Sequence, residues 1–187
     1  MTITAFDPGV IGNYNERKYL LDAMDSTLVS QIGPYVDRFE NDMSLFTGTK
    51  KAVAVANGTC ALQVALRLAG VQNNDEVLTQ ALTFVATANS ISYLGANPVF
   101  IDVDLDTMGL SPKSLKEFLN QNAEIRDDGS YNKKTGKRFS ACLPMHTFGF
   151  MCRIDEIVEI CDKWNIPVIE DAAEALGSQY KGQSCGS

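Results

Sequence analysis

Residues 166–174 read Ile166-Pro167-Val168-Ile169-Glu170-Asp171-Ala172-Ala173-Glu174, an apolar run that passes directly into carboxylates. A short apolar run after a proline is typical of a buried strand. In α/β proteins, ligands bind at the carboxyl ends of such strands. We therefore predict that Asp171 is a buried acid that faces a ligand. The alternative is a strand that turns polar because it meets solvent there.

Outward from this stretch, apolar strands and helices alternate along the chain. We predict strands at 51–56, 76–79, 98–102 and 139–143, and helices at 60–69, at 84–94, from 111 onward and at 154–164. Strands that alternate with helices indicate an α/β layer fold with a largely parallel sheet. Two earlier helices, within 15–28 and 35–46, are expected to form an N-terminal arm or layer. The chain is therefore expected to be one domain, or part of one.

Several segments allow more specific predictions. The helix at 60–69 is apolar nearly all round, which predicts burial on every side. Thr83 is expected to cap the helix at 84–94. Phe84, taken alone, is expected in the core rather than against a ligand. The polar segment 120–138 contains a basic run and is interpreted as a solvated surface excursion. Residues 177–186 are glycine-rich, and no long element is expected there.

The composition excludes several classes of protein. The net charge of −7 argues against a general binder of nucleic acid or anionic membranes, since such proteins carry basic surfaces. No apolar run approaches the roughly 20 residues that cross a bilayer. Five scattered cysteines without a C-x-x-C pair are typical of reduced thiols in a cytoplasmic protein. No metal site is expected: Asp102, Asp104 and Asp106 lack the glycine and closing glutamate of a calcium loop and favour a surface loop.

Two short motifs suggest chemistry. Asn57-Gly58-Thr59 joins a predicted strand to a helix, and a helix N-terminus with a glycine suits a phosphate group. The alternative is that Asn57 or Thr59 serves only as a helix cap. Gly182–Gly186 matches the G-x-S-x-G pattern of serine hydrolases. No apolar strand precedes that pattern, and the one histidine, His146, lies upstream of it. A hydrolase is therefore disfavoured.

Five segments occur in a fixed order: Gly58-Thr59, 83–89 (TFVATAN), 98–104 (PVFIDVD), 144–149 (PMHTFG) and 169–174 (IEDAAE). Together they resemble the DegT/DnrJ/StrS family of nucleotide-sugar aminotransferases, over nearly the whole chain. The resemblance implies the aspartate-aminotransferase-like large domain of fold type I, which is a three-layer α/β domain with a mostly parallel sheet, in a homodimer. It also implies an N-terminal arm at about 1–48, a large domain that is incomplete at its C-terminal end, and no C-terminal small domain in this chain.

The resemblance implies pyridoxal 5'-phosphate as the cofactor. Gly58 and Thr59 would hold its phosphate, Phe84 would stack on its ring, and Asp171 would pair with the ring nitrogen. Glu174 would lie near the ring hydroxyl. A carboxylate beside the nitrogen favours the protonated ring, which makes the cofactor a better electron sink. Many relatives have Gln in place of Glu174; an ionised Glu would repel the ring oxygen, so it is expected to be protonated or turned away.

The implied reaction moves an amino group from glutamate to the C4 keto group of a nucleotide-linked 4-keto-6-deoxy sugar, for polysaccharide biosynthesis. The chain also resembles the subgroup that acts on UDP-linked N-acetylhexosamines. The family's Schiff-base lysine is expected beyond Ser187, and Lys181 does not replace it. The chain alone is therefore expected to be inactive. The alternatives are a pyridoxal-phosphate sugar dehydratase of the same family and a non-catalytic regulator that binds the sugar or the cofactor.

Overall fold

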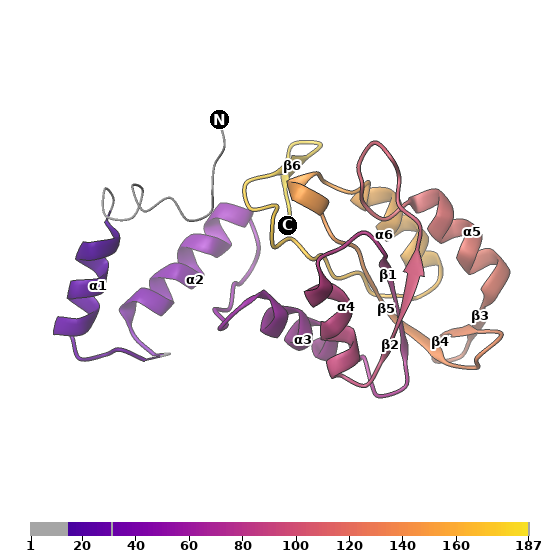
Figure 1. Cartoon of the computed structure of the whole chain (residues 1–187), viewed down its shortest axis with the longest axis horizontal. Helices are drawn as coiled ribbons and strands as arrows, with labels where there is room; N and C mark the ends of the chain where they lie inside the picture. The colour runs from indigo at the N-terminus through magenta and orange to yellow at the C-terminus, as the bar shows by residue number, and fades with distance from the viewer. Residues whose placement is uncertain (1–14, 31, 187) are drawn as a thin grey trace. The chain divides into compact units, whose positions relative to one another are not determined.

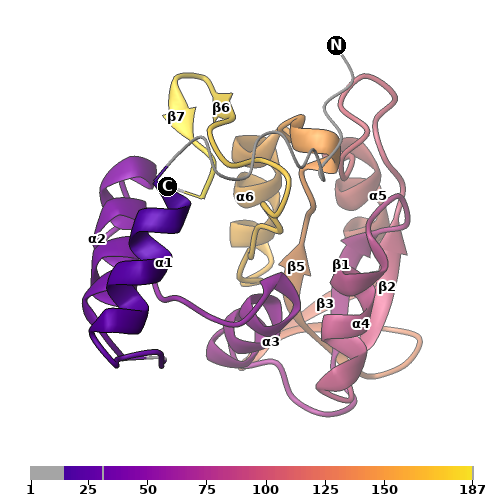
Figure 2. The same ribbon diagram turned by 60° about the vertical axis from the view of Figure 1, so that its left-hand side comes forward.

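The computed structural model describes residues 15–30 and 32–186. The chain divides into two compact units, Met1–Ala54 and Val55–Ser187. Figure 1 shows the helices and strands of both units along the chain, and Figure 2 shows the same ribbon from another side. None of the helices in the described ranges is both long and apolar enough to cross a membrane.

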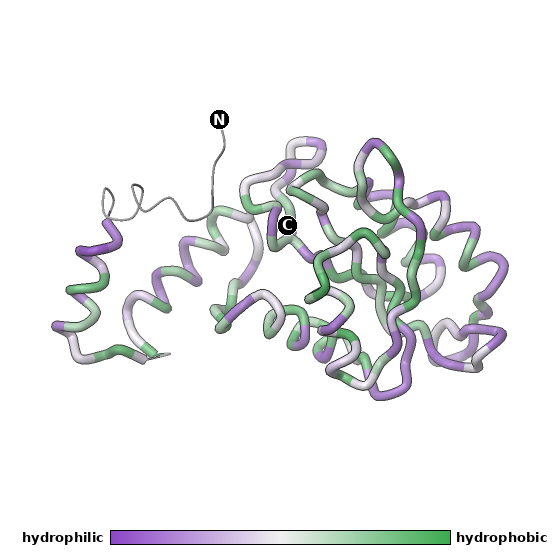
Figure 3. Tube along the Cα trace, viewed as in Figure 1, coloured by the Kyte–Doolittle hydropathy of each residue, from purple (hydrophilic) through white to green (hydrophobic). Residues whose placement is uncertain are grey.

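The first unit contains two helices that contact each other through aromatic side chains. α1 spans Glu16–Asp25, within the predicted segment 15–28, and α2 spans Pro34–Thr47, one residue longer at each end than the predicted 35–46. The rings of Tyr19 and Tyr35 lie with their centroids 5.4 Å apart. α2 ends at Gly48, whose φ of 75° is left-handed and is tolerated by glycine without strain. Apolar residues recur along both helices in Figure 3, yet no described residue of either helix is buried.

The second unit is built on a five-stranded sheet with the order β2-β1-β5-β4-β3. The strands are β1 Glu76–Gln80, β2 Asn97–Ile101, β3 Ala123–Arg126, β4 Gly129–Asn132 and β5 Arg138–Leu143. β1 pairs in parallel with β2 and β5. β3 and β4 form an antiparallel hairpin, and β4 pairs antiparallel with β5. The predicted α/β fold with a mostly parallel sheet is confirmed.

Helices cover both faces of this sheet (Figures 1 and 2): α3 Gly58–Leu68, α4 Val85–Tyr93, α5 Pro112–Asn122 and α6 Ile154–Lys163. Successive side chains of a strand point to opposite faces, so β1 contributes to two cores. Val77 packs with Leu66 of α3 and Ile91 of α4. Leu78 packs in the other cluster, with Leu115 of α5. The unit therefore has three layers, with apolar packing on each face of the sheet.

The stretch at 166–171 lies beside β5, but it forms isolated bridges rather than a regular strand. Parallel bridges join Val168 to Cys142 and Asp171 to Met145. Backbone hydrogen bonds of 2.9–3.1 Å flank both bridges. The predicted position is therefore correct even though the pairing is interrupted: Asp171 lies at the carboxyl end of the parallel sheet.

Gln80, the last residue of β1, connects the loops that follow the strands. Its side chain is fully buried. Its Oε1 accepts the N–H groups of Leu110 and Met145, at 2.8 and 3.1 Å. Its Nε2 donates to the Thr147 hydroxyl at 3.0 Å, and Thr147 begins the short helix η1, Thr147–Gly149. One buried amide thus fixes the carboxyl edge of the sheet, where the predicted ligand site lies.

Two predictions about the start of the layer fold are wrong. Residues 51–56 do not form a strand, because a strand requires hydrogen-bonded neighbours and none pairs with them in the described part of the chain. α3 is buried on one face rather than on every side. Leu62 and Leu66 are buried, whereas Val64 is 49% and Leu68 is 84% exposed. The apolar composition of α3 therefore exceeds what this unit covers.

The predicted cap of α4 is also wrong. Phe84 occupies the N-cap position, and no side chain caps the helix there. The Thr83 hydroxyl instead donates to Thr87 Oγ1, one turn into the helix, at 2.6 Å. The hydroxyl groups at this helix start therefore bond to each other rather than to the free backbone N–H groups.

The polar segment 120–138 is more ordered than a solvated excursion, because it contains the β3–β4 hairpin. Glu76 on β1 is 5% exposed and accepts hydrogen bonds from Asn132 Nδ2 at 2.7 Å and Thr135 Oγ1 at 2.9 Å. A buried carboxylate needs such donors to compensate for lost hydration. Glu76 thus anchors the loop that leaves the hairpin.

Candidate functional site

One pocket of about 280 Å³ contains all five residues that the resemblance assigned to a cofactor. Four separate segments form it: the start of α3, the start of α4, the residues after β5 and the end of the stretch beside β5. Its lining consists of Gly58, Thr59, Leu62, Phe84, Ala86, Met145, Asp171, Ala173 and Glu174. The fold therefore brings together residues that are as much as 116 positions apart in the sequence, from Gly58 to Glu174.

The start of α3 combines a helix cap with free donors. Asn57 is extended, and its Oδ1 accepts the N–H of Cys60 at 2.9 Å. Its carbonyl accepts the N–H of Ala61 at 3.1 Å. The N–H groups of Gly58 and Thr59 therefore have no acceptor within the described ranges. A Cβ placed on Gly58 would meet no atom within 4 Å, so a ligand has room to approach this backbone. An anion is favoured here.

Phe84 lies at the pocket with its ring uncovered. The side chain is 67% exposed, although an isolated aromatic was expected in the core. Its backbone N–H donates to Met145 Sδ at 3.4 Å, which fixes the start of α4 against the segment after β5. An exposed aromatic face of this kind can bind a flat ring.

Asp171 is the buried acid of the pocket, as predicted. It is 5% exposed and lines the cavity. Its Oδ2 accepts the Thr87 hydroxyl at 2.6 Å, and its Oδ1 accepts the N–H of Ala173 at 3.3 Å. A carboxylate held this way can pair with a cationic group of a ligand. The sequence prediction missed Thr87; its place four residues after Thr83, on one helix face, was the available signal.

Glu174 turns one carboxylate oxygen toward η1. Its Oε2 accepts the N–H of Phe148 at 2.8 Å. Phe148 has a left-handed φ of 54°, which is unusual for a residue with a side chain. The next residue, Gly149, passes so close that a Cβ there would lie 2.9 Å from the carbonyl oxygen of Glu174. Glu174 therefore lines the pocket and also holds the strained turn beside it.

A cluster of His146, Glu170 and Cys185 has the residue types of a metal site, and their ligand atoms lie within 4.8 Å of one another. The imidazole Nε2 lies 2.8 Å from Glu170 Oε2, and its Nδ1 accepts the N–H of Cys152 at 3.2 Å. A metal-bound histidine instead donates its second N–H to an acceptor. Burial and the Glu170 charge also raise the pKa of the Cys185 thiol, whereas a metal requires the thiolate. This donor set does not fit a metal.

The protonation of His146 follows from the same contacts. Burial lowers the pKa of His146, and hydrogen bonding to the Glu170 carboxylate raises it. A doubly protonated ring, however, has no lone pair with which to accept the N–H of Cys152. We therefore assign the neutral ring with its proton on Nε2, donated to Glu170.

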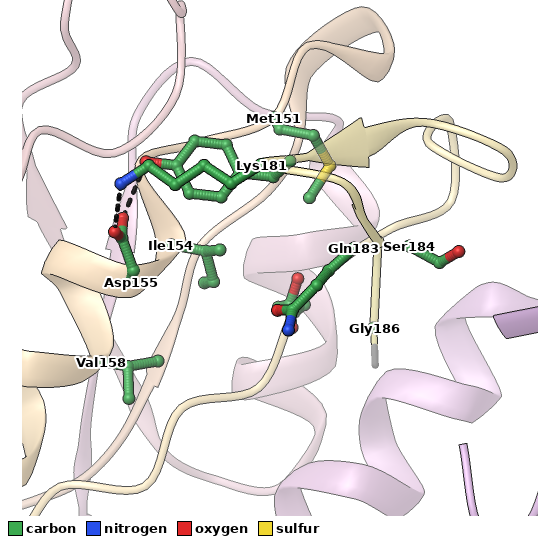
Figure 4. Close-up of a pocket in the computed structure, with 10 residues that line it drawn as sticks. Met151, Ile154, Asp155, Val158, Lys181, Gln183, Ser184 and Gly186 are labelled. Carbon is green, nitrogen blue, oxygen red and sulfur yellow. Dashed lines mark hydrogen bonds and ion pairs between the residues drawn. The ribbon is translucent and has the colours of Figure 1, made fainter. Parts of the chain in front are cut away.

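A second pocket, of about 240 Å³, lies beside α6 (Figure 4). Residues 177–186 form a short hairpin there, with β6 at Gln179–Tyr180 and β7 at Gln183–Ser184. Lys181 Nζ lies 2.5 Å from Asp155 Oδ2, and the Tyr180 hydroxyl donates to Asp155 Oδ1 at 2.7 Å. Hydrogen bonds from Lys181 and Tyr180 lower the pKa of Asp155 to about 2. Lys181 is thus paired in this pocket and does not line the first one.

The two disfavoured motifs lie outside the first pocket. Ser184 belongs to the two-residue strand β7, and no helix follows it in the described part of the chain, unlike the serine of a hydrolase elbow. In the acidic segment, Asp104 and Asp106 both form ion pairs with Arg153. An arginine that neutralises these carboxylates agrees with the predicted surface loop.

Comparisons with known proteins match this chain to one family. The sequence matches the DegT/DnrJ/EryC1/StrS aminotransferase family over residues 11–187. EpsN of Bacillus subtilis, provisionally named a pyridoxal phosphate-dependent aminotransferase, is 41% identical over 172 residues, which are 92% of this chain and 42% of EpsN. The GDP-perosamine synthase of Caulobacter vibrioides is 38% identical over 173 residues, again 92% of this chain and 42% of the relative.

A solved structure shares the fold. The DegT/DnrJ/EryC1/StrS aminotransferase from Brucella abortus superposes with a TM-score of 0.84 at 27% identity, over 99% of this chain and 48% of that one. The chain thus spans less than half the length of the relatives it matches. Pyridoxal phosphate is the cofactor of the family and of its structural neighbours. The match over residues 11–187 and the shared fold show that this chain belongs to the DegT/DnrJ/EryC1/StrS aminotransferase family.

Proposed function

We propose that the pocket between α3, α4 and Asp171 binds pyridoxal phosphate. The observation that supports this most directly is the convergence of three chemically different groups on one cavity. The free N–H groups of Gly58 and Thr59 suit the phosphate, the uncovered ring of Phe84 suits the flat pyridine ring, and the buried Asp171 suits the ring nitrogen.

The chain's own residues would bind and orient this cofactor. When bound, pyridoxal phosphate supplies an electron sink for bond cleavage next to an amine. Asp171 would hold a proton on the ring nitrogen, because an opposite charge favours the charged form of the ring. Phe84 would fix the plane of the ring, and the N-terminus of α3 would fix its phosphate end. Glu174 would lie at the pocket edge near the ring hydroxyl, through the oxygen that does not bond to Phe148.

We propose that the whole protein transfers the amino group of glutamate to the C4 keto group of a nucleotide-linked 4-keto-6-deoxy sugar. The family and the name of one relative, GDP-perosamine synthase, support a nucleotide-sugar substrate. In this proposal, Val55–Ser187 forms the major part of the cofactor-binding domain, and about 1–48 forms the N-terminal arm. The position of the keto group rests on the sequence resemblance.

The binding proposal is tested by titrating this chain with pyridoxal phosphate and following the absorbance and fluorescence of the ring. Saturable binding that Asp171→Asn weakens supports it. Equal binding by the wild type and by Asp171→Asn, or no binding, contradicts it. The matched control is Lys181→Ala, which removes a charge from the other pocket.

The reaction is tested with the whole protein, glutamate and either a 4-keto or a 3-keto nucleotide sugar, with mass spectrometry of the product. An amino sugar formed from the 4-keto compound supports the proposal. An amino sugar formed only from the 3-keto compound contradicts the assigned position. A product that has lost a hydroxyl group and gained no nitrogen indicates a dehydratase instead.

We further propose that the whole protein is a homodimer. In the first unit, α1 exposes Leu20 and Met24 by 62% and 57%, and α2 exposes Phe39 and Phe46 by 54% and 58%. Single exposed apolar residues are ordinary on a protein surface. Two helices without a buried residue instead indicate that another protein surface covers their apolar faces. A second copy is the occupant we propose. Light scattering of the wild type and of Phe39→Glu tests this: a dimeric wild type and a monomeric variant are expected, and a monomeric wild type contradicts it.

A further inference from the structure

We propose that Thr87 is a positioning residue: its hydroxyl, held by that of Thr83, orients the Asp171 carboxylate toward the cofactor ring. This inference rests on the proposed binding of pyridoxal phosphate. Its basis is a chain of three side chains from two segments, with oxygen–oxygen distances of 2.6 Å from Thr83 to Thr87 and 2.6 Å from Thr87 to Asp171.

The direction of these hydrogen bonds is fixed by chemistry. An ionised carboxylate can only accept, so the single hydroxyl hydrogen of Thr87 is donated to Asp171 Oδ2. The Thr87 oxygen can then only accept from Thr83, whose hydroxyl donates to it at 2.6 Å and also lies 2.9 Å from Met145 Sδ. The two hydroxyls therefore point the same way, toward the acid, and successive bonds of this kind strengthen one another.

Burial makes this arrangement effective. Thr87 is fully buried and Asp171 is 5% exposed, so water competes little for either group. Thr87 lies in the first turn of α4, where a β-branched side chain has few accessible rotamers. The Thr87 carbonyl also accepts the Ser90 hydroxyl at 2.7 Å. The backbone of Thr87 is thus bonded within the helix start, and its hydroxyl has few other positions.

The same helix start also positions Phe84, the residue proposed to stack on the cofactor ring. Thr83, Phe84 and Thr87 lie within five consecutive positions of the chain. Phe84 and Asp171 both line the pocket. The first turn of α4 therefore fixes the group proposed to stack on the ring and, through Thr87, the group proposed to pair with its nitrogen. One helix start thus contributes to the position of both contacts.

The test compares pyridoxal phosphate binding by this chain in three variants. Thr87→Val keeps the shape but removes the hydroxyl, and we expect about tenfold weaker binding, the effect of a hydrogen bond to a charged group. Thr87→Ser retains the hydroxyl and is expected to bind within about twofold of the wild type. Thr83→Val removes the more distant hydroxyl and is expected to weaken binding by about threefold.

A matched control separates positioning from general packing. Thr79 is also fully buried, and its hydroxyl donates to the Leu143 carbonyl at 2.7 Å, away from the pocket lining. Thr79→Val removes a comparable buried hydrogen bond and should leave binding unchanged. Nitrogen NMR of bound, isotope-labelled cofactor gives a second readout. Thr87→Val, unlike Thr79→Val, is expected to reduce the protonated fraction of the ring nitrogen.

The outcomes distinguish this inference from the proposed function. If Asp171→Asn weakens binding but Thr87→Val behaves as Thr79→Val does, the positioning role is wrong and the cofactor site stands. If Thr87→Ser binds as weakly as Thr87→Val, the hydroxyl is not responsible, and the role is again wrong. If Asp171→Asn binds as the wild type does, the cofactor site fails, and the positioning role fails with it. Should Thr87→Val not fold, as judged by circular dichroism, Thr83→Val and the nitrogen signal decide.

Discussion

The second unit contains two pockets of similar volume, about 280 and 240 Å³, which differ in how their charged groups are paired. In the first, the buried Asp171 accepts bonds from neutral donors, so its negative charge is not neutralised by a described cation. In the second, Lys181 and Asp155 neutralise each other. Pocket size is therefore a poor guide to a ligand site here. In the first pocket the buried Asp171 can select a cationic ring, whereas in the second the charge of Asp155 is already paired with Lys181.

The largest expected effect comes from removing the charge that distinguishes the first pocket from the second. Asp171→Asn keeps the shape of the side chain but removes its charge, and we expect roughly a hundredfold loss of pyridoxal phosphate affinity, as for other buried charge pairs. Lys181→Ala, in the other pocket, is expected to leave affinity unchanged. Titration followed by cofactor fluorescence measures both. A loss of affinity in Lys181→Ala that equals that of Asp171→Asn would mean that the two pockets do not differ as described.

The next effect concerns the apolar wall of the first pocket. Phe84→Leu removes the flat face, and because the ring is 67% exposed, we expect roughly fivefold weaker cofactor binding with little change in stability. Phe100→Leu is the control, since Phe100 on β2 is also exposed, by 52%, but does not line the pocket. Thermal unfolding and the same titration are measured together. Equal affinity in both variants would show that Phe84 does not contact the ring.

A smaller effect tests the paired charges of the second pocket. The pKa of Asp155 is lowered to about 2, from a model-peptide value of 3.8, by hydrogen bonds from Lys181 and Tyr180. Because the folded-state value is the lower one, the stabilisation by this pair is complete above the unfolded value and is lost as the pH falls through about 2. We expect the NMR signals of the β6–β7 hairpin to titrate with that midpoint. Lys181→Ala should raise the midpoint, and Lys163→Ala, another exposed lysine, should not.

The last prediction concerns the protonation state of His146, which differs by one proton between the neutral and the charged ring. Its hydrogen-bond partner, Glu170, lines the second pocket. We expect nitrogen NMR to show a neutral ring, protonated at Nε2, near neutral pH, because Nδ1 accepts the N–H of Cys152. Added zinc should leave this spectrum unchanged. A doubly protonated ring would show that the Glu170 charge outweighs the hydrogen bond from Cys152. A zinc-dependent shift of the signals would show that the cluster binds a metal after all.

Much of the fold could be predicted from the sequence because its pattern is local. β1, β2 and β5 each contain consecutive apolar residues, and the helices between them show apolar faces. Predictions failed where the outcome depended on neighbours. Residues 51–56 have the composition of a strand, but their state depends on pairing partners. The segment 120–138 is tied to the sheet by hydrogen bonds from Asn132 and Thr135 to the buried Glu76, which lies far away in the sequence.

The candidate site divides in the same way. Gly58, Thr59, Phe84, Asp171 and Glu174 could be named from motifs, because each lies at an element boundary with a recognisable sequence. Their convergence on one cavity could not be read from spacing alone. The exposure of Phe84 was predicted wrongly in isolation, because burial of an aromatic depends on which segments cover it.

The sequence by itself determined the α/β class, the family resemblance and the identity of the acid, because periodicity and short motifs depend on residues close together in the chain. The tertiary structure decided which partners these residues have. Thr87 reaches Asp171 across 84 positions of sequence, and His146 turns its nitrogens to Glu170 and Cys152. Hydrogen bonds are short and directional, so such pairs are set by the packing of the sheet and its helices, and no local pattern encodes them.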